Sequence, residues 1–386
     1  MPNFQTKALV PINYPYCSDD IRFEWEAKSG NESLILTKYK GESFFIKKVI
    51  REKNILIKGD KLSKPSRVKY LQDALKAYEK ATEAKSLFSN IHTSKNRLQK
   101  HSAFLKDLDF FAGEFRSFSK KFEKICIEVG FGSGRHLLFR AKEKPNTLHV
   151  AIEIHKPSIE QVTKQCELQG LENVILIDCD ARVLMEFFAS NSVEKIFVHF
   201  PIPWDEKPHR RVISKNFINE ATRVLQKGGR LEIRSDSDKF FDYSYKVLMS
   251  YEKAHIEIRK NEDLEISSKY EDRWKRMQKN IYDLHMINSQ ISQEREVPSI
   301  LSFDFEVGND KIQKETKLGE NWFVHFETKF EIDEKNYLWR VAFGDASHVE
   351  HCYIRVLDGK PKYFPKNLYA SKNNLLAHKF ICERMR

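Results

Sequence analysis

The chain has 386 residues, of which 41% are hydrophobic and 12% aromatic, enough to bury the cores of two or three domains. This composition excludes a globally disordered protein, and no apolar run approaches the length of a membrane span. The formal net charge of +11 favours an anionic partner such as nucleic acid. The start of the chain lacks a signal-peptide pattern, so a cytoplasmic location without a membrane partner is expected.

Residues 1–60 are predicted to form a β-rich N-terminal extension. Short runs of β-branched and aromatic residues alternate there with turn signals, as in a small sheet; the runs are 21–27, 33–39, 43–50 and 54–59. We expect no site in this region, because its polar positions read most simply as the solvated face of that sheet.

Residues 61–121 are predicted to be a basic, largely helical segment. Apolar residues recur at helical spacing from Tyr70 to Phe88, with lysines between them. Residues 61–106 hold 11 Lys and Arg against three acids. This clustering favours a phosphate-rich partner over a merely solvated helix face.

Residues 122–290 are predicted to be a doubly wound α/β core of Rossmann-like type, because strand and helix patterns alternate along them. The expected strands are 124–130, 148–155, 173–180, 193–200 and 230–236. The expected helices are 135–143, 157–169, 182–190 and 215–227, with Gly170 and Gly228-Gly229 as helix stops. Residues 291–386 return to a β-rich pattern and end on a helix-like stretch. Six scattered cysteines are expected to be free thiols, and no metal site is expected.

The core is organised around the sequence KICIEVGFGSG at residues 124–134. A short apolar strand is followed by Gly130, Gly132 and Gly134 and then by a helical pattern, which is the opening of a nucleotide-binding α/β fold. Glycine suits this turn because it accepts positive φ and lets a ligand approach the backbone. The three glycines and the acid before them, Glu128, are candidate cofactor-binding residues.

Three acids at strand ends indicate which cofactor is held. Glu153 lies where an acid grips ribose hydroxyls, and Asp180 suits an adenine amino group, although a helix N-cap is the alternative for each acid. A dinucleotide fingerprint requires glycine or alanine at the position of Arg135, and Glu128 would repel a pyrophosphate. S-adenosylmethionine, a sulfonium with an ammonium group, is therefore favoured over NAD.

The motifs of the core resemble those of the bacterial tRNA (guanine-N7-)-methyltransferase family over about residues 125–287. The matching motifs, in family order, are EVGFGSG at 128–134, AIEIHKPSI at 151–159, FPIPWDEKPHRRV at 200–212, RSDSDKFFDY at 234–243 and SKYEDRW at 268–274. The resemblance implies a class I methyltransferase that uses S-adenosylmethionine and acts on a guanosine of tRNA. Glu128, Glu153 and Asp180 align with the family's cofactor-binding acids.

The resemblance also implies where substrate is bound. Asp236 and the run Ser268, Lys269, Tyr270 and Glu271 align with substrate-binding positions of the family. A cluster beside the same site adds Lys207, Arg210 and Arg211 as phosphate-binding candidates. Ile202 stands where the family has an aspartate, and Glu206 aligns with its loop lysine. We therefore expect Asp205 or Asp236 to supply the missing catalytic carboxylate.

The function expected from the sequence is methyl transfer from S-adenosylmethionine to N7 of guanosine 46 in the variable loop of tRNA, forming 7-methylguanosine. The expected partner is tRNA, with no obligate protein partner and no metal. Two alternatives stay open: a tRNA-binding protein with weak or no turnover, which Ile202 motivates, and an N7-guanine methyltransferase acting on another RNA. A dehydrogenase is a third and less favoured hypothesis.

Overall fold

The structure, a computed structural model, describes residues 1–91, 103–266, 269–307, 312–345, 348–372 and 374–386. Backbone contacts divide the chain into two compact units. The core unit is Gln99–Ser299, and the accessory unit combines Met1–Leu98 with Ile300–Arg386. The two β-rich ends thus belong to one unit, a pairing that the sequence left open.

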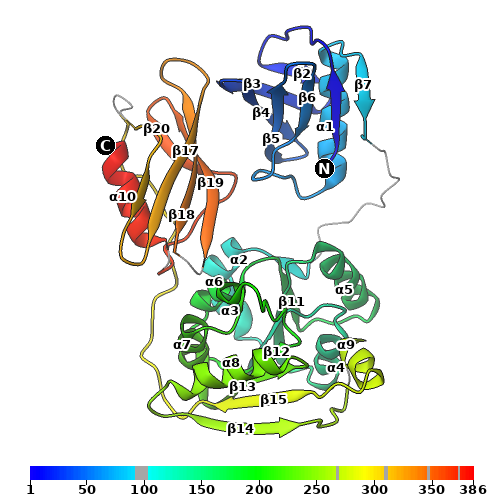
Figure 1. The fold of residues 1–386 in the computed structure, drawn as a ribbon, viewed down its shortest axis with the longest axis vertical. Coiled ribbons are helices and arrows are strands. Elements are labelled where there is room, and N and C mark those ends of the chain that lie inside the picture. Colours follow the sequence, from blue (N-terminus) through cyan, green and yellow to red (C-terminus); the bar gives the residue numbers. More distant parts are fainter. Residues whose placement is uncertain (92–102, 267–268, 308–311, 346–347, 373) are drawn as a thin grey trace. The chain divides into compact units, whose positions relative to one another are not determined.

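The core unit contains a sheet of eight strands in the order β14-β15-β13-β12-β9-β10-β11-β8 (Figure 1). The central strands are parallel: β9 (Lys124–Val129), β10 (Thr147–Ile152), β11 (Val174–Ile177), β12 (Val193–His199) and β13 (Leu225–Ser235). A two-residue strand, β8 (Leu105–Lys106), extends one edge in parallel with β11. The doubly wound fold expected from the sequence is confirmed.

Helices connect the parallel strands as crossovers. They are α4 (Arg135–Glu143), α5 (Lys156–Leu168), α6 (Ala181–Leu184) with the 3₁₀ turn η1 (Met185–Phe187), α7 (Lys215–Val224) and α8 (Asp238–Met249). The short helices α2 (Leu108–Gly113) and α3 (Phe115–Ser119) precede β9, and the 3₁₀ turn η2 (Pro208–Arg210) and α9 (Lys269–Arg276) lie in later loops. Ser214 and Ser237 cap α7 and α8 by accepting bonds from Phe217 N and Phe240 N, both at 3.2 Å.

Two expectations about these elements were wrong. The helix predicted at 215–227 ends at Val224, and Gly228-Gly229 lie inside β13 rather than at a helix stop. The helix predicted at 182–190 is a single turn followed by a 3₁₀ turn. At the first place the backbone of Gly228 and Gly229 bonds to Asn288, and at the second the guanidinium of Arg223 donates to Met185 O and Phe188 O. Tertiary contacts therefore override local sequence signals at both places.

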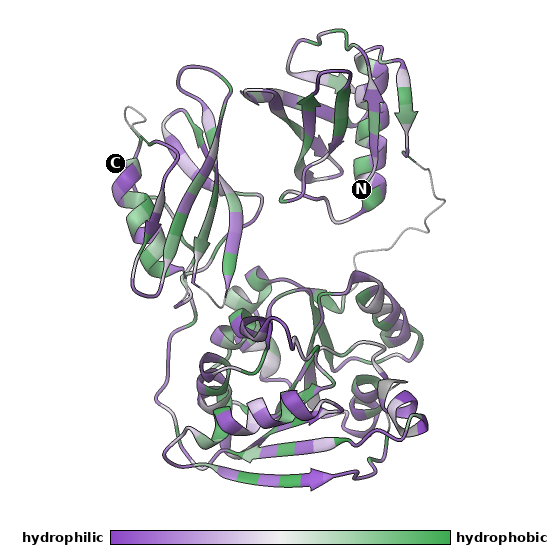
Figure 2. Cartoon of the chain, viewed as in Figure 1, coloured by the Kyte–Doolittle hydropathy of each residue, from purple (hydrophilic) through white to green (hydrophobic). Residues whose placement is uncertain are grey.

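Two antiparallel strands complete the core sheet, and the sequence did not predict them. They are β14 (His255–Lys260) and β15 (Tyr282–Ile287), which pair with each other, while β15 also pairs with β13. In β14, hydrophobic and hydrophilic residues alternate, as expected for an edge strand with one covered face (Figure 2). In contrast, β10 is buried along its whole length, because helices cover both faces of a central strand.

The N-terminal half of the accessory unit is a sheet with one helix. Its strands are β1 (Asn3–Thr6), β2 (Tyr16–Ser18), β3 (Ile21–Ser29), β4 (Glu32–Tyr39), β5 (Glu42–Ile50), β6 (Ile55–Gly59) and β7 (Ser86–Ser89). The helix α1 (Val68–Ala81) buries Leu71, Leu75 and Tyr78 against the sheet. The helix predicted in the basic segment is therefore confirmed, but Leu87 and Phe88 lie in β7 instead. Residues 92–102 of that segment lie outside the described residues.

The C-terminal half of the accessory unit has strands β16 (Thr316–Leu318), β17 (Phe323–Glu331), β18 (Tyr337–Gly344), β19 (Val349–Leu357) and β20 (Lys360–Phe364), followed by α10 (Leu375–Met385). Residues 302–307, in the region expected to be β-rich, are irregular. Both halves form one hydrogen-bonded sheet, because Glu331 of β17 pairs with Lys28 of β3. Within the described parts of the chain, no helix has the length and hydropathy that a membrane span needs.

A buried histidine in the core sheet makes stability depend on pH. His149 in β10 is 4% exposed, and its Nε2 has no hydrogen-bond partner in the described structure. Burial, with smaller contributions from Arg140 and His136, lowers the pKa of His149 from 6.5 to about 4. The unfolded chain therefore binds a proton that the folded chain excludes between these values, so stability falls as pH falls through 6.5.

We expect the core unit to lose about 2 kcal/mol of unfolding free energy through His149 between pH 7 and pH 5. In His149→Gln this loss should disappear from the pH dependence, whereas His255→Gln, at an exposed position of β14, should keep the wild-type slope. Urea unfolding at each pH, followed by hydrogen exchange at β10 amides, measures the difference. Equal slopes in wild type and His149→Gln would contradict the assignment.

Candidate functional site

The glycine loop connects β9 to α4 in a backbone conformation that side chains resist. Gly130, Gly132 and Gly134 have φ values of 76°, 52° and 74°, in the left-handed region that glycine enters without strain. A Cβ on Gly134 would lie 2.5 Å from Cγ2 of Val162, so this glycine also permits α4 to pack on α5. Apart from the residues directly before and after each glycine, no described atom lies within 4 Å of a Cβ built on Gly130 or Gly132, so the backbone there is open to approach.

Glu128 is the penultimate residue of β9 and is only 7% exposed. Its Oε2 lies 2.8 Å from Nδ1 of His136, in the first turn of α4. The imidazole of His136 packs against the rings of Phe197 and His199, with centroid distances of 4.7 and 4.8 Å. Burial lowers the pKa of His199 well below its ordinary value, with His136 acting in the same direction. The carboxylate beside the glycine loop is thus held by a neighbouring imidazole.

Glu153 follows β10 and bonds to the glycine loop. Its Oε2 accepts from Gly132 N at 3.0 Å, and its Oε1 accepts from Ile154 N and His155 N at 2.8 and 3.0 Å. Each carboxylate oxygen has two lone pairs, so these bonds leave acceptor capacity on the side chain. The acid expected to grip ribose hydroxyls therefore also fixes the shape of the loop.

Asp180 lies at the start of α6, where it acts as the N-cap considered in the sequence analysis. Its Oδ1 accepts from Arg182 N at 2.9 Å, and its Oδ2 accepts from the Arg182 guanidinium at 2.6 Å. Adenine binding by this side chain stays a prediction.

The loop after β12 is held in an unusual backbone conformation. Phe200 and Trp204 have φ values of 50° and 45°, which non-glycine residues seldom adopt. Between them Ile202 is 61% exposed, although it is a large apolar side chain. The guanidinium of Arg210 lies over the Trp204 ring at 5.1 Å.

The basic residues of this loop do not share one environment. Lys207 and Arg210 are exposed. Arg211 is 6% exposed and stabilises the loop: its Nε donates to Pro203 O at 2.6 Å, and one Nη donates to Asp205 at 3.1 Å. Its guanidinium also lies 4.5 Å from the Tyr243 ring. Contact of Arg211 with RNA stays a prediction, since its visible role is to hold Asp205 and the loop.

Asp236 follows β13, and Lys279 donates to its Oδ2 at 2.9 Å. The same ammonium lies 3.9 Å from the Trp274 ring of α9. The side chain of Asp236 is 19% exposed, against 42% for Asp205. Both candidate catalytic carboxylates are therefore paired with a cation, and Asp205 is the more accessible of the two.

The last group of predicted substrate residues is in and before α9. Glu271 is 1% exposed and accepts from Arg234 at 2.9 Å. Ser268 lies outside the described residues, and only the backbone of Lys269 and Tyr270 is described, at the start of α9. The substrate roles of Ser268, Lys269 and Tyr270 stay predictions. The substrate role of Glu271 also stays a prediction, and its side chain is buried against Arg234.

The helix α9 is joined to the glycine loop region by an ion pair. Arg135, directly after Gly134, donates to Asp272 of α9 at 2.6 Å. Both side chains are about half exposed, so the pair contributes little stability. It does place the predicted substrate helix beside the start of α4.

The register of the parallel strands brings most of these residues to one edge. Val129 pairs with Ile152 and with Val198, Ile152 pairs with Ile177, and His199 pairs with Arg234. The residues that follow these strand ends are the glycine loop, Glu153, the segment ending in Asp180, the loop from Phe200, and Asp236. Ligands of open α/β sheets bind outside this carboxyl edge.

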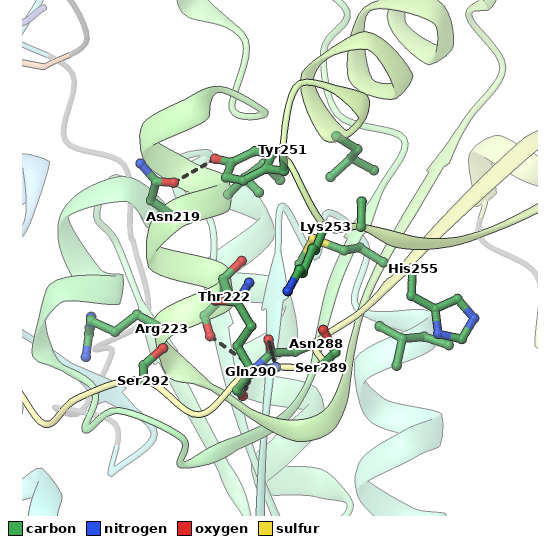
Figure 3. A pocket seen from close by; sticks show the side chains of 15 residues that line it. Asn219, Thr222, Arg223, Tyr251, Lys253, His255, Asn288, Ser289, Gln290 and Ser292 are labelled. Carbon is green, nitrogen blue, oxygen red and sulfur yellow. Dashed lines mark hydrogen bonds between the residues drawn. The ribbon is translucent and has the colours of Figure 1, made fainter.

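A pocket of about 250 Å³ lies at the opposite edge of the same sheet (Figure 3). Residues of α7, the start of β14 and the end of β15 line it, and its polar groups hold neighbouring backbone. Tyr251 donates to Lys215 O at 3.0 Å, and Asn288 donates to Leu225 O at 2.7 Å. We assign it a structural role in joining β15 to α7.

Sequence reasoning missed three residues of the candidate site: His136, Arg234 and Asp283. Arg234 is 1% exposed, and one of its nitrogens donates to both oxygens of Asp283 at 2.7 and 2.6 Å. Burial raises the pKa of the Asp283 carboxyl, and Arg234 opposes that effect. Arg234 and Asp283 are 49 residues apart, so only the antiparallel pairing of β13 with β15 reveals them. His136 had a local signal, an imidazole two residues after the last loop glycine.

Comparison with known proteins gives a consistent family. Residues 122–284 match a family model described as a putative methyltransferase. A curated tRNA (guanine-N(7)-)-methyltransferase of Campylobacter jejuni strain 81-176 is 42% identical, covering 98% of this chain and 96% of the relative. Proteins of the same name from Wolinella succinogenes and Helicobacter hepaticus are 37% and 34% identical, each covering 99% of both chains.

Among solved structures, a 16S rRNA methyltransferase, KamB, is similar to 46% of this chain and 93% of its own. It is 16% identical with a TM-score of 0.37, a level of similarity that says nothing about substrate.

The buried Arg234 network predicts a large loss of stability when one partner is removed. In Asp283→Ala, the guanidinium of Arg234 loses its closest carboxylate while it stays buried, and about 3–5 kcal/mol of unfolding free energy should be lost. Arg259→Ala removes an exposed pair with Glu262, and should cost less than about 1 kcal/mol. Urea unfolding read by hydrogen exchange at β13 and β15 compares the two variants. Equal losses would contradict the network's importance.

Proposed function

Because the chain belongs to the tRNA (guanine-N(7)-)-methyltransferase family, we propose that it transfers the methyl group of S-adenosylmethionine to N7 of a guanosine in tRNA, at position 46 of the variable loop. The observation that carries the proposal is identity of 34–42% over nearly the whole chain to curated proteins of that name. The strand-end arrangement around the glycine loop supports it independently.

The residues at the carboxyl edge fit the proposed methyl donor. The open backbone at Gly130 and Gly132 permits close approach, and Glu128 offers a buried carboxylate to a cationic ligand. Glu153 keeps one lone pair, on Oε2, for a ribose hydroxyl beside the loop that it stabilises. Ile154, 71% exposed and two residues after the end of β10, adds an apolar surface next to these polar groups. When bound, the donor supplies an electrophilic methyl group on a sulfonium.

The reaction requires alignment of the guanine with the methyl donor more than it requires proton transfer. Guanine N7 carries a lone pair and no proton, so its attack on a methyl group needs no general base. The chain's contribution is to hold the base edge in line with the donor and to stabilise the developing positive charge on the purine. We propose that Asp205 or Asp236 fulfils the second task, because Ile202 has no charge to offer. Lys207 and Arg210 are exposed nearby and suit tRNA phosphates.

The location and partners follow from the same proposal. The substrate is tRNA, and no obligate protein partner or metal is proposed. The cytoplasmic location expected from the sequence stays a prediction.

The proposal is tested by incubating the full chain with unmodified tRNA and S-adenosylmethionine labelled in its methyl group. We expect label in 7-methylguanosine at position 46, and none in a matched tRNA carrying adenosine there. Label at another guanosine, or only in another RNA, would refute the assigned position or substrate. Tight tRNA binding without methyl transfer would instead support the alternative of a tRNA-binding protein. The observation that favours this alternative is the exposed Ile202, which stands where the family has an aspartate.

The catalytic carboxylate is tested by substitution. We expect Asp205→Ala or Asp236→Ala to lower kcat by about 100-fold, since one preorganised charged group is commonly worth that much in the transition state. Asp242→Ala, an exposed carboxylate of α8, serves as the matched control and should retain wild-type turnover. Wild-type kcat in both Asp205→Ala and Asp236→Ala would eliminate the hypothesis.

A further inference from the structure

Two strands of the accessory unit place lysines directly opposite each other. Lys47 of β5 pairs in register with Lys58 of β6, so the two side chains project from the same face. Like charges opposite one another destabilise a strand pair. Glu32 accepts from Lys47 at 2.7 Å, but no described acid forms an ion pair with Lys58. Burial lowers the pKa of Lys58, and the nearby cations Lys47, Lys61 and Arg51 lower it further, whereas Glu32 acts in the opposite direction.

A second like-charge pair lies in the C-terminal half of the same unit. Arg355 of β19 pairs in register with Lys362 of β20. Burial lowers the pKa of Arg355, and among described residues no carboxylate offsets the effect. The guanidinium of Arg355 lies 5.8 Å from the centroid of the Phe364 ring, so an aromatic ring rather than an acid packs against it.

Both pairs border one apolar cluster that the two halves share. Lys47 lies two residues from Phe45 and Arg355 two residues from Tyr353, and side chains two apart share a face of a strand. The rings of Phe45 and Tyr353 are 5.2 Å apart. The acid at this place, Asp60, accepts from the Tyr353 hydroxyl at 3.0 Å and from Ser63, so hydrogen bonds within the unit occupy it.

We infer that these cations form a phosphate-binding surface through which the accessory unit holds the backbone of tRNA. The surface, called the basic face, consists of Arg51, Lys58, Lys61, Arg355 and Lys362, with Lys47, which is already paired with Glu32, beside them. Opposite side chains of paired strands lie about 5 Å apart at their Cβ atoms, so two cations can contact one phosphate. Phosphate binding offsets the repulsion within each pair and releases counterions. The inference rests on the proposed function for the identity of the RNA.

The test neutralises one member of each pair. In the double variant Lys58→Thr/Lys362→Thr, threonine keeps the strand preference while the like-charge repulsion is removed. We expect the Kd for tRNA at 0.1 M salt to rise about 5- to 10-fold and the slope of log K against log salt to fall in magnitude by about 2. The thermal midpoint of the free protein should stay the same or rise, which a merely structural role would not produce.

The matched control is Lys38→Thr, on a strand of the same unit. Lys38 is already paired with Glu24 at 2.8 Å, so its loss should change tRNA affinity less than twofold. An unchanged Kd and slope in the double variant, or an equal loss in the control, would overturn the inference. So would a loss of binding to phosphatidylserine vesicles with tRNA affinity unchanged. Because binding is measured without a methyl donor, it can fail or succeed independently of methyl transfer.

Discussion

The parallel register of β9 with β10 and β12 is the constraint on which the core unit depends. It brings the ends of these strands to one edge, so that residues far apart in sequence meet around the glycine loop. The loop is further fixed by Glu153, which crosses from β10 to accept from Gly132 N. A shift of register by one residue would turn the side chains of a whole strand to the other face and dismantle this arrangement.

Buried charge is concentrated at the same edge, where it is paired rather than isolated. Glu128 is matched by His136, and Arg234 is matched by Asp283 and Glu271. Isolated charges at these depths would be costly, whereas paired ones hold β13, β15 and α9 in fixed relation. The pairing also distinguishes exposed from buried residues among those predicted to bind substrate. Lys207 and Arg210 are exposed, while Arg211 and Glu271 are buried and stabilise the scaffold.

The curated relatives share the accessory unit as well as the core. The family model covers only residues 122–284, but the curated relatives align with 98–99% of this chain. These relatives share the accessory unit, and in this chain it carries two like-charge strand pairs. We therefore assign the unit a role in binding the RNA substrate. The sequence alone placed the basic signal in 61–106, and of the basic face only Lys61 lies in that segment. The other members lie in or directly after β5, β6, β19 and β20, and strand pairing reveals that Lys47 faces Lys58 and that Arg355 faces Lys362.

The sequence by itself determined the fold class, the glycine loop and the strand-end acids, because those depend on local periodicity and on the conformational freedom of glycine. It also determined α4 from Arg135 to Glu143. Tertiary structure alone decided that Gly228-Gly229 lie within β13, that β14 and β15 complete the sheet, and that Arg234 meets Asp283. The physical reason is range: strand pairing and burial join residues tens of positions apart, and no local pattern records which partners they will find.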